Sequence, residues 1–263
     1  MKLEIQYLKK IIKKAGDEVL KYYKLDRQKQ NLVKKKDGSP VTKADLASNK
    51  IILDGLKKFK LPILSEESKD ILKSNINSRD FWVIDPLDGT KDFIKQNGEF
   101  SIMVALVLDN QPFFGMIQEP ALNNLYYASK NQGAFKEKGN KISSIKVSST
   151  DTINKLKLIV SRNHLTQKEI DLAKKLKLSY VQRGSAGSKI ARIAHGKADI
   201  YLNSSDKMFI WDTCAGFVIL EEAGGKATDI YGKKLRYNLK NVKHKNGFLA
   251  TNKIFHDLIV ERI

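Results

Sequence analysis

The fold is decided by the stretch Phe81-Trp-Val-Ile-Asp85-Pro-Leu-Asp88-Gly-Thr90. Its apolar start predicts a buried strand over residues 81–84 that ends in two aspartates three residues apart. Proline cannot continue a central ladder and glycine permits a tight turn, so we expect both carboxylates at the carboxyl end of the strand, where α/β proteins place their ligands. Two carboxylates so close repel each other and need a cation or a proton between them. A turn with solvated aspartates is the alternative, but it explains the whole cluster poorly.

Three further acids stand at comparable points of the chain. Glu66 follows a short apolar strand, whereas Asp45 and Asp212 lie near the predicted starts of helices. Each also has an ordinary explanation as a capping or first-turn acid, because negative charge there stabilises the helix dipole. Individually they are weak signals, so their weight comes from the combination with the first pair.

Taken together, the candidate oxygen ligands are Glu66, Asp85, Asp88, Asp212 and Asp45. Carboxylates without a histidine or cysteine companion favour Mg²⁺ or Mn²⁺ over zinc. Clustered carboxylates that hold two or more such ions catalyse phosphoryl transfer to water. The residues themselves therefore indicate a metal-dependent phosphatase.

The chain has 263 residues, of which 41% are hydrophobic, so it can bury a core as one large domain or two small ones. Its 48 basic and 29 acidic residues give a formal net charge of +19. The basic residues are mostly lysines scattered along the chain, which favours a solvated basic surface over a nucleic-acid site. A surface of this sign also attracts anionic substrates.

No run approaches the roughly 18–20 apolar residues that span a bilayer, so we expect no membrane insertion. Lysine pairs interrupt the apolar residues of segment 1–16, which therefore does not read as a secretory signal. The single cysteine, Cys214, excludes a disulfide framework. We expect a cytoplasmic protein in which Cys214 is a small packing residue.

In the first half, apolar periodicity predicts helices over residues 3–23 and 42–59, separated by a polar turn at 34–40. After the short strands at 63–64 and 81–84, three consecutive antiparallel strands are expected at 100–108, 112–118 and 125–128. The polar segment 138–152 predicts turns and a boundary between an N-terminal half, residues 1–150, and a C-terminal half, residues 151–263.

In the second half, strands and helices alternate. Strands are expected at 158–161, 199–202 and 248–251, and helices at 166–176, 188–195, 211–222 and from about 254. Mixed sheets layered with helices, an α/β fold, are the expected architecture.

At its acidic motifs the chain resembles the inositol monophosphatase superfamily of Mg²⁺-dependent, lithium-sensitive phosphatases. Residues 85–93 match the signature of that superfamily, and residues 95–100 match its 3′(2′),5′-bisphosphate nucleotidase branch of the CysQ type. Residues 39–45, 64–67 and 211–216 match in order and approximate spacing. The resemblance covers nearly the whole chain and implies a layered αβαβα fold, in which two mixed-sheet halves form one catalytic unit.

By this resemblance, two or three Mg²⁺ ions, for which Mn²⁺ can substitute, are held by Glu66, Asp85, Asp88, Asp212 and the backbone carbonyl of Leu87. Asp45 reaches a more weakly held ion. The implied catalytic residues are Thr90 and Asp45, which orient the attacking water, together with Glu66. The implied reaction is in-line attack of metal-activated water without a phosphoenzyme.

The resemblance implies 3′-phosphoadenosine 5′-phosphate as substrate, hydrolysed to AMP and phosphate, and a role in clearing a by-product of sulfate assimilation. The implied substrate contacts are Gly89, Thr90, His164, Ser185, Lys189 and Asp212. Residues 201–206 lack an arginine that many relatives carry, and Lys207 can replace it only as a point charge. Many relatives are dimers, so a homodimer is a further expectation.

Three alternatives stay open. The missing arginine favours an inositol or sugar monophosphate phosphatase of the same superfamily, which residues 91–93 and 98–100 oppose. A haloacid-dehalogenase-type enzyme requires Asp-x-Asp, where this chain has Asp-x-x-Asp. A non-enzymatic nucleic-acid binder rests only on the net charge of +19 and predicts salt-sensitive binding that survives Asp85→Asn.

Overall fold

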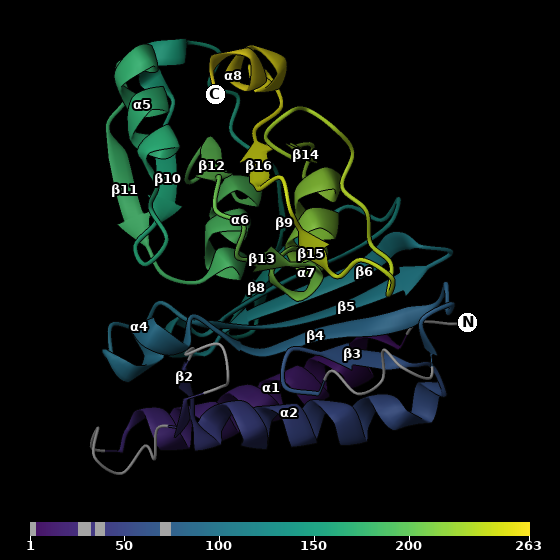
Figure 1. Ribbon diagram of the computed structural model, residues 1–263. Coiled ribbons are helices and arrows are strands. Elements are labelled where there is room, and N and C mark those ends of the chain that lie inside the picture. Colours follow the sequence, from purple (N-terminus) through teal and green to yellow (C-terminus); the bar gives the residue numbers. More distant parts are fainter. Residues whose placement is uncertain (1–3, 26–32, 35–39, 69–74) are drawn as a thin grey trace.

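The computed structural model describes residues 4–25, 33–34, 40–68 and 75–263 (Figure 1). Most of the polar turn expected at 34–40, including Ser39 of the first matching motif, lies outside the described residues. Within them, every helix is too short or too polar to cross a membrane.

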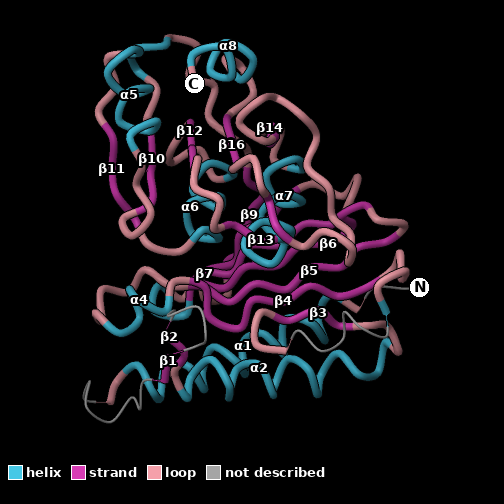
Figure 2. Tube along the Cα trace, viewed as in Figure 1, coloured by secondary structure: helices cyan, strands magenta, loops and turns pink. Residues whose placement is uncertain are grey.

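Five layers stack in the order helix, sheet, helix, sheet, helix (Figures 1 and 2). The outer layer beneath the larger sheet holds α1 (Ile5–Tyr23) and α2 (Lys43–Leu56). The middle layer holds α6 (Ala186–Ala194) and α7 (Ile210–Glu222), and α5 (Gln167–Leu176) and α8 (His256–Arg262) cover the smaller sheet. The predicted layered α/β architecture is therefore confirmed.

The larger sheet has seven strands in sequence order. They are β3 (Ile63–Ser65), β4 (Phe81–Asp88), β5 (Ser101–Leu108), β6 (Gln111–Glu119), β7 (Asn124–Ser129), β8 (Ala134–Lys138) and β9 (Lys141–Ile145). Strand β3 is parallel to β4, and all later neighbours are antiparallel. The apolar faces of α1 and α2 pack on this sheet through residues such as Leu8, Ile12 and Ile52.

The smaller sheet has five strands in the order β11-β10-β12-β16-β14. They are β10 (Leu158–Ser161), β11 (Tyr180–Arg183), β12 (Ile200–Asn203), β14 (Lys226–Thr228) and β16 (Phe248–Thr251). Two-stranded pairs join β1 (Val33–Lys34) to β2 (Pro40–Val41) and β13 (Met208–Phe209) to β15 (Lys243–His244). The single-turn helix α4 (Thr90–Ile94) follows β4 directly.

Strand β4 corrects the prediction that the chain leaves the sheet at Ile84. The strand continues through Pro86 to Asp88, because its register against β5 shifts: Asp85 pairs with Met103, whereas Asp88 pairs with Ser101. Three steps along β4 thus match two along β5, which is a β-bulge. Proline has no N–H to give to a ladder, and the bulge removes the need for one.

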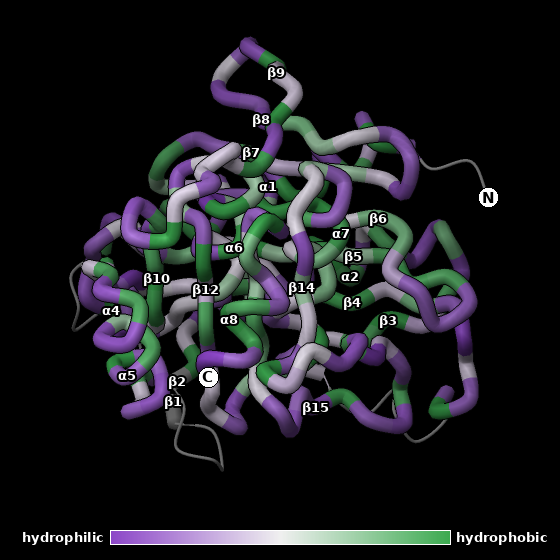
Figure 3. The backbone as a smooth tube through the Cα atoms, turned by 90° about the horizontal axis from the view of Figure 1, so that it is seen from above, coloured by the Kyte–Doolittle hydropathy of each residue, from purple (hydrophilic) through white to green (hydrophobic). Residues whose placement is uncertain are grey.

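The β8–β9 hairpin is a second correction, because segment 138–152 was expected to hold turns only. Three of the five residues in each strand are polar, and the first four residues of β9 are exposed. Seen from above, the hairpin projects from the body and is largely hydrophilic, whereas the central strands are hydrophobic (Figure 3). A strand that buries so little of its surface leaves no apolar alternation in the sequence.

Helix α7 lies against the larger sheet, where it contacts β4 to β8, and also packs on α6. The approach is closest at Gly115 of β6, where a Cβ would lie 2.2 Å from the carbonyl oxygen of Ala215. Ala215, which follows Asp212 closely in α7, is buried in this contact, and Gly216 beside it packs against Ile190 of α6. The position of Asp212 over the sheet therefore depends on small residues on both sides.

We predict that Gly115→Ala lowers the free energy of unfolding by about 1–3 kcal/mol, because the added methyl group overpacks the contact between α7 and β6. Chemical denaturation of the variant and the wild type measures the change. Ser143→Ala, at an exposed position of β9, is the control, because it adds no atom to a packed contact. A cost at Gly115 no larger than that at Ser143 contradicts the packing account.

Candidate active site

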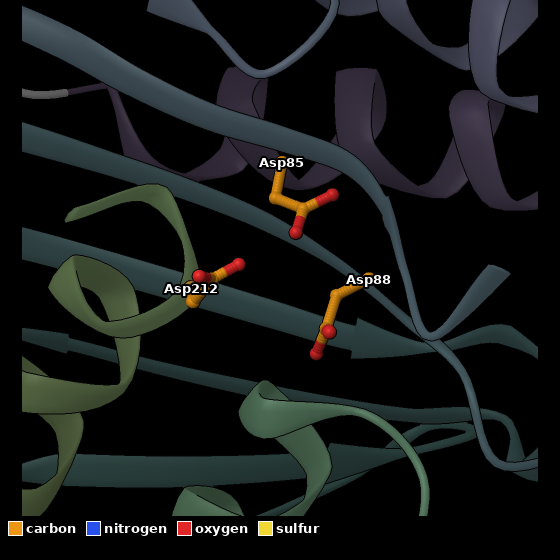
Figure 4. A group of neighbouring side chains, drawn as sticks. All are labelled: Asp85, Asp88 and Asp212. Atoms are coloured by element: carbon orange, nitrogen blue, oxygen red, sulfur yellow. The ribbon is translucent and has the colours of Figure 1, made fainter. Parts of the chain in front are cut away.

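Three carboxylates from two elements meet at the centre of the molecule (Figure 4). Asp85 and Asp88 come from β4, and Asp212 comes from α7. One carboxylate oxygen from each lies within 4.8 Å of the others. Asp212 is therefore brought to the two acids of β4, from which it is far in the sequence, as the acidic motifs predicted.

The bulge in β4 explains why Asp85 and Asp88 face the same way. Residues three apart in a regular strand point to opposite faces of the sheet. The extra residue of the bulge restores the alternation, so both side chains point toward α7. Asp85 also accepts a hydrogen bond of 3.0 Å from the backbone N–H of Leu87, which fixes its carboxylate inside the bulge.

Asp212 lies in the first turn of α7, three residues after Phe209, which is the N-cap. Its carboxylate accepts a hydrogen bond of 2.7 Å from the N–H of Phe209. Asp212 thus satisfies the helix end with one oxygen and still joins the acidic cluster. The capping explanation and the ligand explanation apply to the same side chain.

The acidic cluster is electrostatically unfavourable as it stands. Burial, followed by the nearby charges of Glu66, Asp88 and Asp212, raises the pKa of Asp85 well above its ordinary value. Burial and the charges of Asp88 and Glu66 do the same to the pKa of Asp212. The buried ammonium of Lys189 partly opposes the rise at both Asp88 and Asp212.

This donor set fits hard divalent cations. All of its ligating atoms are oxygens, and buried carboxylates that repel one another are stabilised by a positive ion between them. Glu66 belongs to the same set, because its charge raises the pKa values of Asp45, Asp85, Asp88 and Asp212.

Thr90 and Asp45 form a linked pair at the edge of the cluster. The Thr90 hydroxyl lies 3.2 Å from both Asp45 Oδ1 and the carbonyl oxygen of Leu87, and donates its proton to one of them. The other Asp45 oxygen accepts hydrogen bonds from the N–H and hydroxyl of Thr42 at 2.8 and 2.6 Å. Burial raises the pKa of Asp45 to about 7.

Asp88 is held by a loop from the second half of the chain. Its Oδ2 accepts hydrogen bonds from the Ser185 hydroxyl at 2.6 Å and from the N–H of Gly187 at 2.8 Å. Ser185 has φ +55°, a left-handed conformation that costs a non-glycine residue about 1–3 kcal/mol. Ser185, the strained residue, is therefore one of those that connect the second half of the chain to Asp88.

A cavity of ≈ 170 Å³ opens beside the cluster. Its lining includes eight of the residues proposed from the sequence, namely Glu66, Asp88, Gly89, Thr90, His164, Ser185, Lys189 and Asp212. Asp85 lies next to it within the cluster, and Asp45 and Leu87 join through Thr90. All the candidate residues thus gather in one place.

Lys189 is more constrained than the sequence suggested. Its ammonium donates to the backbone carbonyls of Arg183, Gly184 and Ser185 at 3.3, 3.3 and 2.8 Å. The side chain is 2% exposed, and burial lowers its pKa to about 8. Lys189 therefore holds the loop that carries Ser185, while its charge acts on the acids from behind that loop.

Sequence reasoning missed a second network that fixes the same loop. Glu99 pairs with Arg162 and Arg183, and accepts a hydrogen bond of 2.9 Å from the N–H of Gly184. Arg162 also pairs with the fully buried Asp92 of α4. Glu99 and Asp92 lie inside the motifs noted above, but their arginine partners are more than 60 residues away and carry no local signal.

The comparisons with known proteins identify the family. The sequence matches the family model described as "Inositol monophosphatase family" over residues 3–263. It is 32% identical to the 3′(2′),5′-bisphosphate nucleotidase CysQ of Salmonella typhimurium, over 92% of this chain and 96% of that one. For the enzyme of the same name from Escherichia coli K12, the identity is 34%, over 90% and 95%.

Solved structures give the same result. The CysQ of Bacteroides thetaiotaomicron is 30% identical with a TM-score of 0.79, and the match covers 92% of this chain and 94% of that one. The IMPase of Thermotoga maritima is 26% identical with a TM-score of 0.80, over 98% and 95%. Because the family model matches nearly the whole of this chain, the chain belongs to the inositol monophosphatase family.

Proposed function

We propose that this protein is a Mg²⁺-dependent 3′(2′),5′-bisphosphate nucleotidase that hydrolyses 3′-phosphoadenosine 5′-phosphate to AMP and phosphate. The observation that carries the proposal is the mixed charge around one cavity, which is lined by both acids and lysines. A bisphosphate needs one group that receives the scissile phosphate and another that neutralises the second phosphate.

The basic group consists of Lys91, Lys189 and Lys207. All three line the cavity, and after burial their charges are the causes that lower the pKa of His164. Lys91 and Lys207 are exposed, whereas the ammonium of Lys189 is committed to backbone carbonyls. Lys91 and Lys207 are therefore the side chains we assign to the second phosphate, in place of the arginine that many relatives carry.

The acidic group would hold the metal ions. Asp85, Asp88, Asp212 and Glu66 supply carboxylate oxygens, and the Leu87 carbonyl and Asp45 are the proposed further ligands. Bound Mg²⁺ lowers the pKa of a coordinated water and neutralises charge on the phosphate oxygens. Since these acids come from residues 1–150 and 151–263, we propose that the two halves work as one catalytic unit.

Thr90 is the residue we assign to orienting the water. We assign its proton to the hydrogen bond with Asp45 Oδ1, which leaves an oxygen lone pair to accept a hydrogen bond from a water in the cavity. This fixes the direction in which the water presents its own lone pair. In-line attack at phosphorus needs this orientation.

The comparisons support the nucleotidase proposal, because the curated relatives named above carry that activity in their names over more than nine-tenths of their length. We extend it to a role in sulfate assimilation, where the substrate is a by-product. An inositol or sugar monophosphate phosphatase is the second candidate, and the absence of an arginine from residues 201–206 favours it.

We predict a kcat/KM for 3′-phosphoadenosine 5′-phosphate at least about tenfold above that for inositol 1-phosphate, measured as phosphate release in millimolar Mg²⁺. Lys207→Gln should reduce the value for the bisphosphate about tenfold and spare the monoester, because it removes one charged contact. Lys174→Gln, on the exposed side of α5, is the control. Preference for the inositol ester contradicts the proposed substrate and leaves the phosphatase chemistry intact.

We also predict that Mg²⁺ stabilises the chelator-treated protein, by about 2.7 kcal/mol at 100 times its Kd. The raised pKa values of Asp85 and Asp212 mean that the folded, metal-free state binds extra protons. The free energy of unfolding of the metal-free protein should therefore fall as pH rises above the ordinary carboxyl pKa of about 3.9. At a fixed Mg²⁺ concentration, the gain in stability from Mg²⁺ should then grow with pH.

Asp85→Asn tests in the same experiment whether repulsion among the carboxylates is the source of the gain from Mg²⁺. It removes one of the mutually repelling charges, so it should stabilise the chelated protein at pH 7.5 and reduce the gain from Mg²⁺. Thermal unfolding with and without Mg²⁺ measures both effects. Equal gains from Mg²⁺ in the variant and the wild type would place the ions elsewhere.

Thr90→Ala should lower kcat by about a hundredfold or more, because the attacking water loses its orienting hydroxyl. Thr90→Ser keeps the hydroxyl and should retain most of the activity. The midpoint of activation by Mg²⁺ should be similar in all three proteins, since Thr90 contributes no carboxylate. Wild-type turnover in Thr90→Ala refutes the assignment.

A further inference from the structure

A second basic cavity lies at the edge of the smaller sheet, outside the site described above. It has a volume of ≈ 250 Å³ and lies between β10, β11 and residues at the end of α6. The described residues that line it include four cations and no carboxylate: Lys157, Arg183, Arg192 and Lys197. Aliphatic residues such as Leu158 and Ile159 also line it.

Arg192 has a hydrogen-bond donor that is unsatisfied within the described structure. Its Nε is buried and has no hydrogen-bond partner among the described residues. A buried donor without a partner costs about 1–3 kcal/mol, and more when it is charged. Within the described part of the chain, neither Arg192 nor Lys157 nor Lys197 has a carboxylate within ion-pair distance.

The cations around the cavity also repel one another. After burial, the charge of Arg192 is the next cause that lowers the pKa of Arg183. Burial, followed by the charges of Lys136, Lys197 and Arg192, lowers the pKa of His195, which lies just beyond the end of α6. The nearby acids include Glu99, Glu119 and Asp199. Glu119 is buried and accepts a hydrogen bond of 2.8 Å from Asn124, and Asp199 accepts one of 2.7 Å from the N–H of Lys157.

We propose that this cavity is an anion site, separate from the catalytic cavity, that binds a phosphate-sized oxyanion. Two guanidinium groups present planar sets of N–H donors, which match the oxygens of phosphate in a bidentate manner. The lysines add charge at the rim. Free phosphate and the phosphate group of a small ester satisfy the same donors.

The site is coupled to the catalytic loop through Arg183. In the structure, Arg183 Nη1 lies 3.1 Å from Glu99 Oε1, and the same carboxylate accepts from the N–H of Gly184, next to Ser185. An anion in the cavity competes with Glu99 for Arg183. Because coupling between two contacts is reciprocal, weakening the Arg183–Glu99 pair should tighten anion binding.

The test is calorimetric titration of chelator-treated protein with inorganic phosphate, so that the catalytic carboxylates repel the probe and no turnover occurs. We expect binding to the wild type, a loss of about tenfold or more in Arg192→Gln, and unchanged affinity in Lys207→Gln, the matched change in the catalytic cavity. Glycerol 3-phosphate in place of phosphate shows whether an ester is also accepted.

Glu99→Gln tests the coupling and should bind phosphate more tightly than the wild type, because Arg183 is released. The Arg192→Gln result decides the site by itself if Glu99→Gln does not fold. No phosphate binding to the wild type, or equal affinity in Arg192→Gln, overturns the proposal. Loss of binding in Lys207→Gln alone also overturns it, since the probe would then occupy the catalytic cavity.

Discussion

The central constraint of the structure is the repulsion among three carboxylates, one buried and two half-buried, that the backbone holds within 4.8 Å of one another. The bulge in β4 fixes Asp85 and Asp88 on one face, and the first turn of α7 fixes Asp212 opposite them. Most proteins pair or neutralise such groups. The raised pKa values of Asp85 and Asp212 favour bound protons in the metal-free protein, and we propose that a divalent cation takes their place, so that the repulsion becomes affinity for the ion.

The second half of the chain supplies the means to hold this arrangement. Ser185 and Gly187 donate to Asp88, Lys189 binds the loop from behind, and Glu99 ties the same loop to the first half through Arg162 and Arg183. These hydrogen bonds and ion pairs involve charged groups, which makes them stronger than hydrogen bonds between neutral groups. They also connect the catalytic cluster to the edge of the smaller sheet, where the second basic cavity lies.

The sequence predicted the layered fold and the candidate site residues more completely than it predicted the contacts that hold those residues in place. The long periodic segment 3–23 identified its helix, and acids placed directly after apolar strands identified Glu66, Asp85 and Asp88. The sequence did not predict the bulge at Pro86, because the pairing of β4 with β5 determines the bulge and leaves no periodic pattern in the sequence. The pairing of Glu99 with two arginines depends on contacts between distant segments, which no local motif encodes. The hydrogen bonds from Lys189 to backbone carbonyls depend on the geometry of the loop, which no local motif encodes either.

The measurement that tests the central claim most directly is the anomalous diffraction of crystals soaked in Mn²⁺. The account predicts peaks among the carboxylates of Asp85, Asp88 and Asp212, with Glu66 and the Leu87 carbonyl within ligand distance. Crystals of Asp88→Asn should lose or weaken at least one of them. Peaks confined to other acids, or an ordered acidic cluster without metal at saturating Mn²⁺, would contradict the claim that this repulsion exists to bind ions.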